Sequence, residues 1–141
     1  MGYGGEVKSA AEVTQYSNDK GIDGIIKEDI LGLGRIYIQA KRYARENSIG
    51  REEIQKFVGA LAVAQSNKGV FITTSSYSKG AVQYAENLNG ATALVLIDGK
   101  QLAEYIYEYN LGMQIEQTIE IKKLDSDYWD SMTDELQDNA L

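Results

Sequence analysis

Residues 21–41, GIDGIIKEDILGLGRIYIQAK, decide the fold that the sequence predicts. The segments GIDGIIK (21–27) and RIYIQAK (35–41) are short and rich in isoleucine, a composition typical of β-strands. The connection between them, EDILGLG, is rich in turn residues. Two strands separated by so short a turn are expected to pair as an antiparallel hairpin.

Helices and strands are expected to alternate after this hairpin. The spacing of apolar residues predicts a helix over 51–67, where Glu52 and Glu53 in the first turn suit the helix dipole. The later elements expected are a strand over 69–74, a helix over 79–88 capped by Ser78, a strand over 91–97, a helix over 99–109 that begins with an Asp98–Gln101 capping box, and a last strand within 114–123. The first two strands should pair antiparallel and the next two parallel. The predicted fold class is therefore α/β, with a mixed central sheet flanked by helices on both faces.

The composition excludes several kinds of active site. The chain of 141 residues has neither histidine nor cysteine, so histidine-based catalytic triads, thiolate zinc sites and disulfides are all impossible. Any metal ion would need hard oxygen ligands, which suit magnesium, manganese or calcium. The length fits one domain, and no run of 18 apolar residues or signal-like N-terminus is present. We therefore expect a cytoplasmic protein with no membrane partner.

The net charge of −7 is unevenly distributed along the chain. Residues 124–141 contain six acidic side chains and no basic one, so we expect an acidic C-terminal tail, either a short helix or partly disordered. Residues 35–56 instead hold six basic side chains against three acidic ones. A local positive patch of this kind is what phosphate contact requires, so the overall acidity does not exclude a nucleic-acid partner.

Three polar side chains interrupt the two apolar strands of the predicted hairpin. Asp23 lies between Ile22 and Ile25, and strand alternation places Gln39 and Lys41 on one face of the second strand. If the strands pair, a carboxylate, an amide and an ammonium converge. Such a cluster could hold a metal ion and stabilise charge on a phosphate. The alternative is structural: Asp23 forms a turn or a buried salt bridge with Lys41, and Gln39 caps a backbone group.

Several segments that follow one another along the chain resemble the catalytic domain of one enzyme family. They are GIDGIIKED, LGL, IYIQAKRY, IGREEIQKFVGAL, KGVFITTSSYS, LIDG and YNLGM. Together they resemble Mrr-type restriction endonucleases within the PD-(D/E)XK nuclease superfamily. QAK (39–41) is the Mrr variant of the (D/E)XK element, and GIDG (21–24) supplies the aspartate. The resemblance runs from MGYGG to about IKKLDSDYW and implies a restriction-endonuclease-like catalytic domain over residues 1–123.

The resemblance implies a role for each residue of the site. Asp23 would be the main metal-binding carboxylate, Gln39 a ligand or a metal-water contact, and the Ala40 carbonyl a further ligand. Lys41 would be the catalytic lysine. Gln55, on the helix after the hairpin, would help to position phosphate or water, and the alternative is an exposed helix residue. The cofactor implied is Mg²⁺, with Mn²⁺ as a substitute.

Basic residues near the predicted site are candidates for contacts with double-stranded DNA. Arg42 and Arg45 lie beyond the end of the second strand and could hold the flanking phosphates. Lys20 stands where the family usually has a glycine, and it could add a phosphate contact.

The sequence also departs from the family pattern. The family's opening helix, with an acidic residue near the site, should precede MGYGG, and the DNA-recognition domain typical of Mrr proteins is absent from these 141 residues. We expect a Mg²⁺-dependent, type IV restriction-like deoxyribonuclease, for which methylated DNA is one candidate target. Two alternatives stay open: a nuclease-fold module that binds DNA or a protein without cutting, and a homodimer in which a neighbour completes the site.

Overall fold

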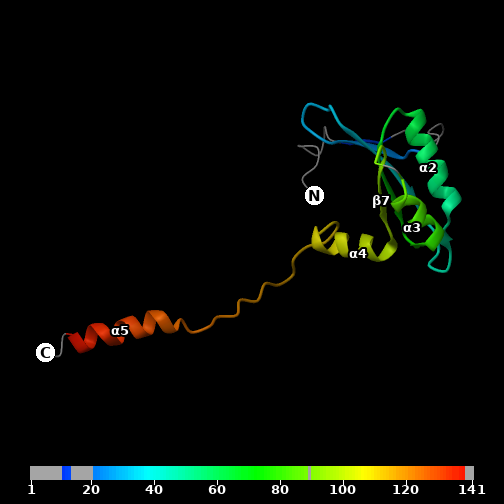
Figure 1. Cartoon of the computed structure of the whole chain (residues 1–141). Coiled ribbons are helices and arrows are strands. Elements are labelled where there is room, and N and C mark those ends of the chain that lie inside the picture. Colours follow the sequence, from blue (N-terminus) through cyan, green and yellow to red (C-terminus); the bar gives the residue numbers. More distant parts are fainter. Residues whose placement is uncertain (1–10, 14–20, 89, 139–141) are drawn as a thin grey trace.

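A five-stranded sheet forms the centre of the molecule (Figure 1). The computed structural model of the chain describes residues 11–13, 21–88 and 90–138. The strands of the sheet, in spatial order, are β1 (Ala11–Val13), β2 (Gly24–Lys27), β3 (Arg35–Lys41), β5 (Lys68–Thr73) and β7 (Ala93–Ile97). Neighbours among β1, β2 and β3 pair antiparallel, whereas β3, β5 and β7 pair parallel. The predicted hairpin and the predicted parallel strands are therefore confirmed.

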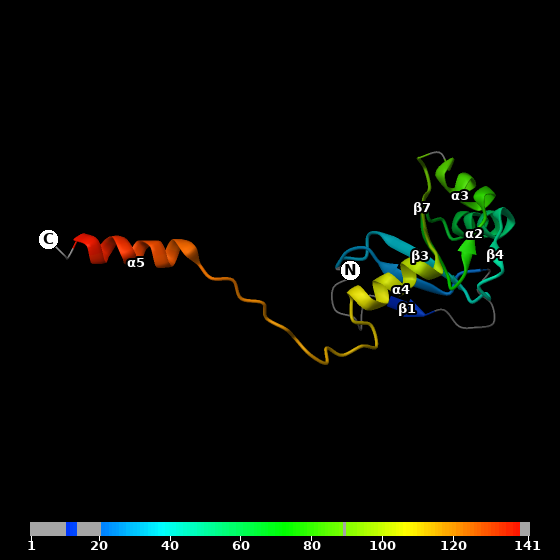
Figure 2. The same ribbon diagram turned by 90° about the horizontal axis from the view of Figure 1, so that it is seen from below.

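Helices cover both faces of this sheet. α2 (Arg51–Val63) and α3 (Lys79–Glu86) lie together on one face, and α4 (Gly99–Glu108) lies on the other, as Figure 1 and Figure 2 show. The predicted α/β fold, a mixed sheet with helices on both faces, is confirmed. Across the part of the chain that the structure describes, no helix has the length and apolar content needed to cross a membrane.

The starts of two helices are fixed by the caps that the sequence predicts. The Ser78 side chain accepts a hydrogen bond from the backbone of α3, and Asp98 with Gln101 forms a reciprocal capping box at the start of α4. A small parallel sheet of β4 (Ser48–Ile49) and β6 (Ser76–Tyr77), which was not predicted, joins the loops that follow β3 and β5.

Three predictions about secondary structure are wrong. The strand expected over 21–27 begins only at Gly24, after a left-handed φ of 86° at Gly21. The helix expected over 51–67 ends at Val63, because Gln65 adopts a left-handed φ of 56° that an α-helix does not contain. Residues 114–123, expected as a strand, are exposed and have no regular structure, because the chain after α4 leaves the sheet (Figure 1). The acidic tail contains α5 (Ser126–Asp138), which matches the helical alternative for this segment.

The core lies between α2 and the sheet. Ile54, Phe57 and Leu61 of α2 are buried against the sheet, and the ring of Phe57 meets Phe71 edge-on at 5.5 Å between centroids. Gly69 on β5 allows this close approach, since a Cβ built there would lie 2.8 Å from the ring of Phe57. The apolar stripe of α2 therefore sets the distance between the helix and the strands that carry the site.

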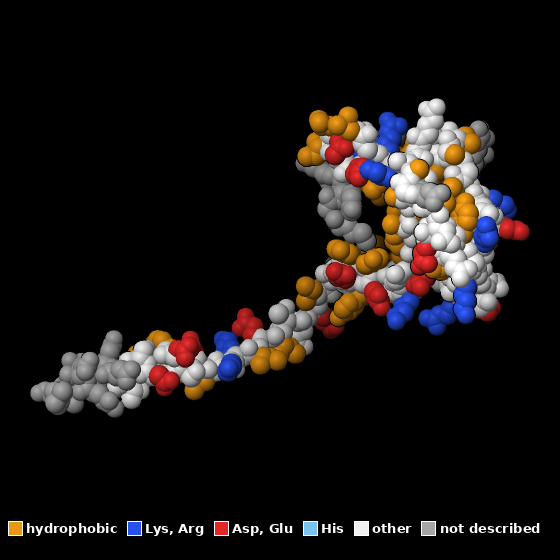
Figure 3. All heavy atoms as spheres, in the orientation of Figure 1, with side chains coloured by type: hydrophobic (Ala, Val, Ile, Leu, Met, Phe, Trp, Pro, Cys, Tyr) orange, Lys and Arg blue, Asp and Glu red, His pale blue; other side chains and the backbone are white. Residues whose placement is uncertain are grey.

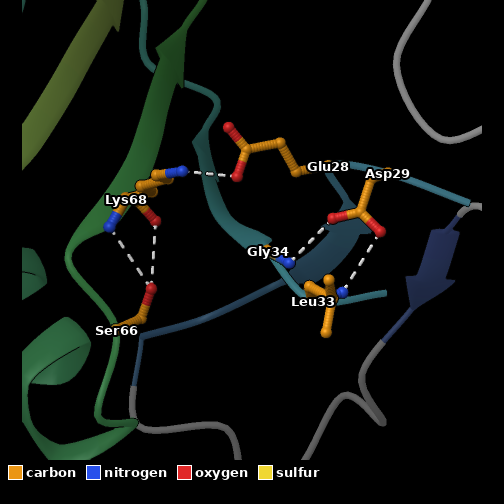
Figure 4. A network of polar contacts seen from close by, with 6 residues as sticks. All are labelled: Glu28, Asp29, Leu33, Gly34, Ser66 and Lys68. Atoms are coloured by element: carbon orange, nitrogen blue, oxygen red, sulfur yellow. Dashed lines mark hydrogen bonds and ion pairs between the residues drawn. The ribbon is translucent and has the colours of Figure 1, made fainter. Parts of the chain in front are cut away.

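Asp29 closes the turn between β2 and β3, as Figure 4 shows. Its Oδ2 accepts a hydrogen bond from the N–H of Gly34 at 3.0 Å, and its Oδ1 accepts one from the N–H of Leu33 at 3.2 Å. These backbone donors hold the pKa of Asp29 below its usual value of 3.8. Next to it, Glu28 forms an ion pair with Lys68 of β5. The turn is therefore fixed both within the hairpin and to the neighbouring strand.

Replacing Asp29 with alanine is expected to destabilise the hairpin in a pH-dependent way. Because the pKa of Asp29 is lowered in the folded chain, the ionised carboxylate stabilises the fold above its usual pKa, and this contribution is lost as the pH falls through the folded pKa. Thermal unfolding followed by circular dichroism should show a lower melting temperature for D29A than for the parent at pH 7. The difference should shrink as the pH falls below the usual pKa of 3.8. A constant difference at every pH would contradict the electrostatic origin.

Candidate active site

The carboxylate of Asp23 reaches from the start of β2 to the end of β3. The backbone N–H of Asp23 donates to the carbonyl of Ile38 at 2.8 Å, and its Oδ2 accepts from the N–H of Ala40 at 2.7 Å. Asp23 is exposed, and its Oδ1 has no hydrogen bond to any residue that the structure describes. One carboxylate oxygen therefore fixes the side chain beside QAK, while the other faces solvent and is available to a ligand.

Gln39 lies on the face of β3 that α2 covers, with 8% of its surface exposed. Its amide lies against Gly21, because a Cβ built on Gly21 would come within 3.3 Å of Gln39 Nε2. Gly21 has a φ of +86°, in the left-handed region that glycine adopts without steric cost. The GIDG segment therefore supplies both the Asp23 carboxylate and the space beside the Gln39 amide.

Replacing Gly21 with alanine is expected to destabilise the chain by about 1–2 kcal/mol, the usual cost of a left-handed non-glycine residue. The new methyl group would also press on the Gln39 amide, so the side-chain NH₂ signals of Gln39 should shift in ¹⁵N NMR spectra. Urea unfolding measures the stability loss. Gly59→Ala is the control, because a Cβ there meets nothing within 4 Å and alanine favours the helix. Equal stability of G21A and G59A would contradict the prediction.

Lys41 ends β3, and its Nζ lies 4.0 Å from Oε2 of Glu53 on α2. Lys56 lies 3.8 Å from the other oxygen of Glu53. The ion pair of Lys41 is thus with Glu53, whereas Asp23 bonds the backbone of Ala40. This arrangement differs from the structural alternative of an Asp23–Lys41 salt bridge, and it brings the ammonium to the same end of the hairpin as the Asp23 carboxylate.

The loop after β3 is fastened to the end of β5. Oγ1 of Thr74 accepts a hydrogen bond from the N–H of Tyr43 at 3.0 Å and donates one to the Tyr43 carbonyl at 2.8 Å. The N–H of Thr74 also donates to the Lys41 carbonyl at 3.3 Å. Arg42 and Arg45, both exposed, therefore extend from an anchored loop directly beyond Lys41.

Next to this loop is an open hollow of about 750 Å³. It is lined by residues of three segments: Arg45, then Thr74, Ser75 and Ser76, and the α4 residues Gly99, Lys100, Ala103, Glu104 and Tyr107. Figure 3 shows Lys and Arg side chains gathered at this end of the domain, where β3 and β5 finish. The third predicted DNA contact, Lys20, lies outside the described residues.

Gln55 is not part of this cluster. It lies with Arg51, Glu52, Gly59 and Ala62 on the exposed stripe of α2, opposite the stripe that packs on the sheet. Its part in positioning phosphate or water remains a prediction. The α2 side chain that the structure brings to Lys41 is Glu53 instead.

Glu53 is the site residue that sequence reasoning missed. Its place in the first turn of the helix indicates only a favourable interaction with the helix dipole. A signal was present, since Glu53 shares one face of the helix with Phe57 and Ala60 at positions i, i+4 and i+7, and both of these are buried. An acidic residue at the start of a buried stripe lies at the rim of the packed face, where a strand-end lysine can reach it.

The donor atoms near QAK fit a hard divalent cation. They are all oxygens: the Asp23 carboxylate, the Gln39 amide and the Ala40 carbonyl, which Mg²⁺ accepts as ligands. Within residues 11–13, 21–88 and 90–138, no three Asp, Glu, His or Cys side chains form a metal-binding group. Mg²⁺ commonly binds one or two protein carboxylates and keeps several waters, so a single carboxylate supported by neutral oxygens suffices for this ion.

Comparisons with known proteins point to one group of enzymes. Residues 1–106 match the family model Mrr_cat, described as "Restriction endonuclease". Over 130 residues the chain is 40% identical to the type IV methyl-directed restriction enzyme EcoKMrr of Escherichia coli (strain K12), a match that covers 92% of this chain and 40% of that enzyme. The chain thus spans about two-fifths of the length of this relative.

Solved structures support the fold. The DNA modification-dependent restriction endonuclease AspBHI is similar with a TM-score of 0.55 and 19% identity, over 74% of this chain and 27% of that one. A protein of unknown function, AF1548, is similar with a TM-score of 0.57 and 14% identity, over 88% of this chain and 67% of that one. The sheet that carries Asp23 and QAK is therefore a scaffold shared with a restriction enzyme.

Proposed function

Because the chain belongs to the Mrr_cat family of restriction endonucleases, we propose that it hydrolyses phosphodiester bonds of double-stranded DNA with the help of Mg²⁺ or Mn²⁺. The observation that carries the proposal is the convergence of three side chains at one end of the β2–β3 hairpin. The Asp23 carboxylate is hydrogen-bonded to Ala40, and the flanking residues Gln39 and Lys41 lie on the face of β3 that α2 covers.

In this proposal the cation is held by Asp23, Gln39 and the Ala40 carbonyl. The Asp23 carboxylate contributes the negative charge, and its bond to the Ala40 N–H orients it. The burial of Gln39 against Gly21 restricts the amide to few orientations. A cation bound there polarises a phosphoryl oxygen and acidifies water.

Lys41 stabilises the negative charge that develops on the phosphate oxygens during hydrolysis. Its ammonium can donate hydrogen bonds to a phosphate oxygen or orient the attacking water. The Glu53 carboxylate, 4.0 Å away, restrains the flexible lysine side chain at the rim of the site. Lys41 is 36% exposed at its side chain, so it remains accessible to a DNA strand.

The basic side chains beyond β3 position the DNA backbone. Arg42 and Arg45 extend from a loop fastened to Thr74, and guanidinium groups bind phosphates through paired hydrogen bonds. Lys100, which lines the same hollow as Arg45, adds a third basic side chain. These contacts would hold DNA independently of its sequence, as phosphate contacts do.

The names of two relatives support a proposal for the substrate class. EcoKMrr is methyl-directed and AspBHI is DNA modification-dependent, as their names state. We propose that methylated DNA is the target of this protein as well. Phosphate contacts carry no sequence information, so the catalytic domain alone should cut modified and unmodified DNA alike.

One observation favours a second candidate, a nuclease-fold module that binds DNA without cutting it. In the described part of the chain, no three Asp, Glu, His or Cys side chains gather to hold a metal ion, at Asp23 or elsewhere. A metal site with so few charged ligands would bind the cation weakly. Phosphate binding by Arg42 and Arg45 would not be affected.

Plasmid cleavage with Mg²⁺, Mn²⁺ or EDTA tests the proposal. Supercoiled DNA, methylated and unmethylated, should be nicked or linearised with either cation, and EDTA should stop the reaction. Calorimetry should show uptake of Mg²⁺ or Mn²⁺ by the chain without DNA. DNA binding without cleavage and without cation uptake would instead establish the binding module.

A further inference from the structure

An apolar C-terminal arm, residues 111–133, extends from the domain without covering any part of it (Figures 1 and 3). Its large apolar side chains are between 43% and 94% exposed: Leu111, Met113, Ile115, Ile119, Ile121, Leu124, Tyr128, Trp129 and Met132. Soluble monomers rarely expose so many apolar side chains in one continuous stretch, and such surfaces usually mark a binding site. The arm therefore has the character of a surface that binds a partner.

The first part of the arm has the pattern of a strand with one apolar face. Over residues 113–121, four of the five odd-numbered positions are apolar, namely Met113, Ile115, Ile119 and Ile121, and the fifth is Gln117. The positions between them carry Gln114, Glu116, Thr118 and Glu120. Alternation with a period of two fits a strand at the border of a sheet and does not fit a helix. The segment needs only a sheet edge to pair with.

The central sheet offers such an edge at β7. β7 is the last strand in the order β1-β2-β3-β5-β7. The N–H of Ala93 donates to Asn67, so Ala93 and Val95 turn their backbone groups toward β5, while those of Leu94 and Leu96 turn outward. No described residue accepts a hydrogen bond from the outward N–H groups. No described strand pairs with this side of β7. Such open edges pair readily with other chains.

We propose that residues 113–121 of one copy of this chain add as a strand to β7 of a second copy, which does the same in return. The exchange gives a dimer with a continuous sheet across each contact, and it covers the apolar face of the arm. Each added strand also satisfies the outward backbone groups of Leu94 and Leu96.

The handedness of the crossover connections favours a second copy of the chain as the partner of the arm. The chain steps outward from β3 to β5 to β7 through α2 and α3, which lie on one face of the sheet. α4 lies on the opposite face. A right-handed crossover through α4 would therefore place the next strand on the inner side of β7, and β5 already occupies that position. Parallel addition to its own β7 would require a left-handed crossover, which is rare. A second copy meets no such restriction.

Two neighbouring substitutions test the proposal by sedimentation velocity or light scattering. Ile119→Lys places a charge on the apolar face of the arm, and Thr118→Lys places the same charge on the polar face. Both positions are exposed, so neither change should disturb the domain. The parent and T118K should have twice the chain mass of 15.6 kDa, and I119K should have the mass of one chain. A monomeric parent, or equal behaviour of the two variants, would overturn the proposal.

Hydrogen exchange identifies the surface to which the arm binds. In the dimer, the amides of Leu94 and Leu96 should exchange at least about tenfold more slowly than in I119K, because an added strand protects them. The protection should fall as the parent is diluted toward monomer. Protection that persists in a monomeric parent would place the arm on its own β7 and overturn the exchange between copies. A dimer whose β7 amides stay unprotected would overturn the proposed edge.

Discussion

Asp23→Asn is expected to slow DNA cleavage by at least about 10³-fold, which corresponds to about 4 kcal/mol of lost transition-state stabilisation. Asparagine keeps an oxygen that can accept the hydrogen bond from the Ala40 N–H, so the hairpin should stay intact. The variant removes the negative charge that faces solvent beside Gln39. Single-turnover cleavage of supercoiled plasmid with Mg²⁺ measures the loss, and circular dichroism checks the fold.

A companion variant separates the metal site from the chemistry. Lys41→Met keeps the length of the side chain and removes its charge, so cleavage should fall by about 10²–10³-fold. Calorimetry should show weaker Mg²⁺ uptake in D23N and unchanged uptake in K41M. Asp127→Asn, a change of the same kind on exposed α5, should leave the rate unchanged. Parental cleavage rates in both D23N and K41M would end the assignment of the site.

The part of the site that could be predicted is the part that one hairpin determines. Asp23 and Lys41 are 18 positions apart, and the pairing of β2 with β3 is set by local strand patterns and a short turn. Glu53 could not be placed in the same way, because its contact with Lys41 depends on how α2 docks on the sheet. Helix docking is a tertiary property, and a helical pattern gives the buried stripe without its position along the strands.

The fold shows the same division between local and tertiary determinants. The caps at Ser78 and Asp98 are contacts within four residues, and sequence reasoning placed both. The pattern over 114–123 predicts a strand, but a strand forms only when an edge accepts it, and no edge of the described sheet pairs with this segment. The small β4–β6 sheet has two residues in each strand, too few to leave a pattern.

Phe57→Ala is expected to lower the free energy of unfolding by about 3–5 kcal/mol. Phe57 has no exposed surface, and its ring fills the space between α2, Phe71 and the backbone of Gly69. Gly69 has no side chain that could move into the cavity, so the cavity should persist and the cost should lie toward the upper part of this range. Domains of this size have about 5–15 kcal/mol of stability, so the variant should keep only a fraction of it.

Urea unfolding followed by circular dichroism measures this loss, with Val63→Ala on the same helix as the control. Val63 is 66% exposed, so its truncation should change stability by no more than about 0.5 kcal/mol. The difference between the two variants isolates the packing of α2 on the sheet from any effect on the helix itself. The same packing brings Glu53 to Lys41, so F57A should also reduce DNA cleavage under conditions where the chain remains folded. A stability loss as small as that of V63A would contradict the packing described for α2.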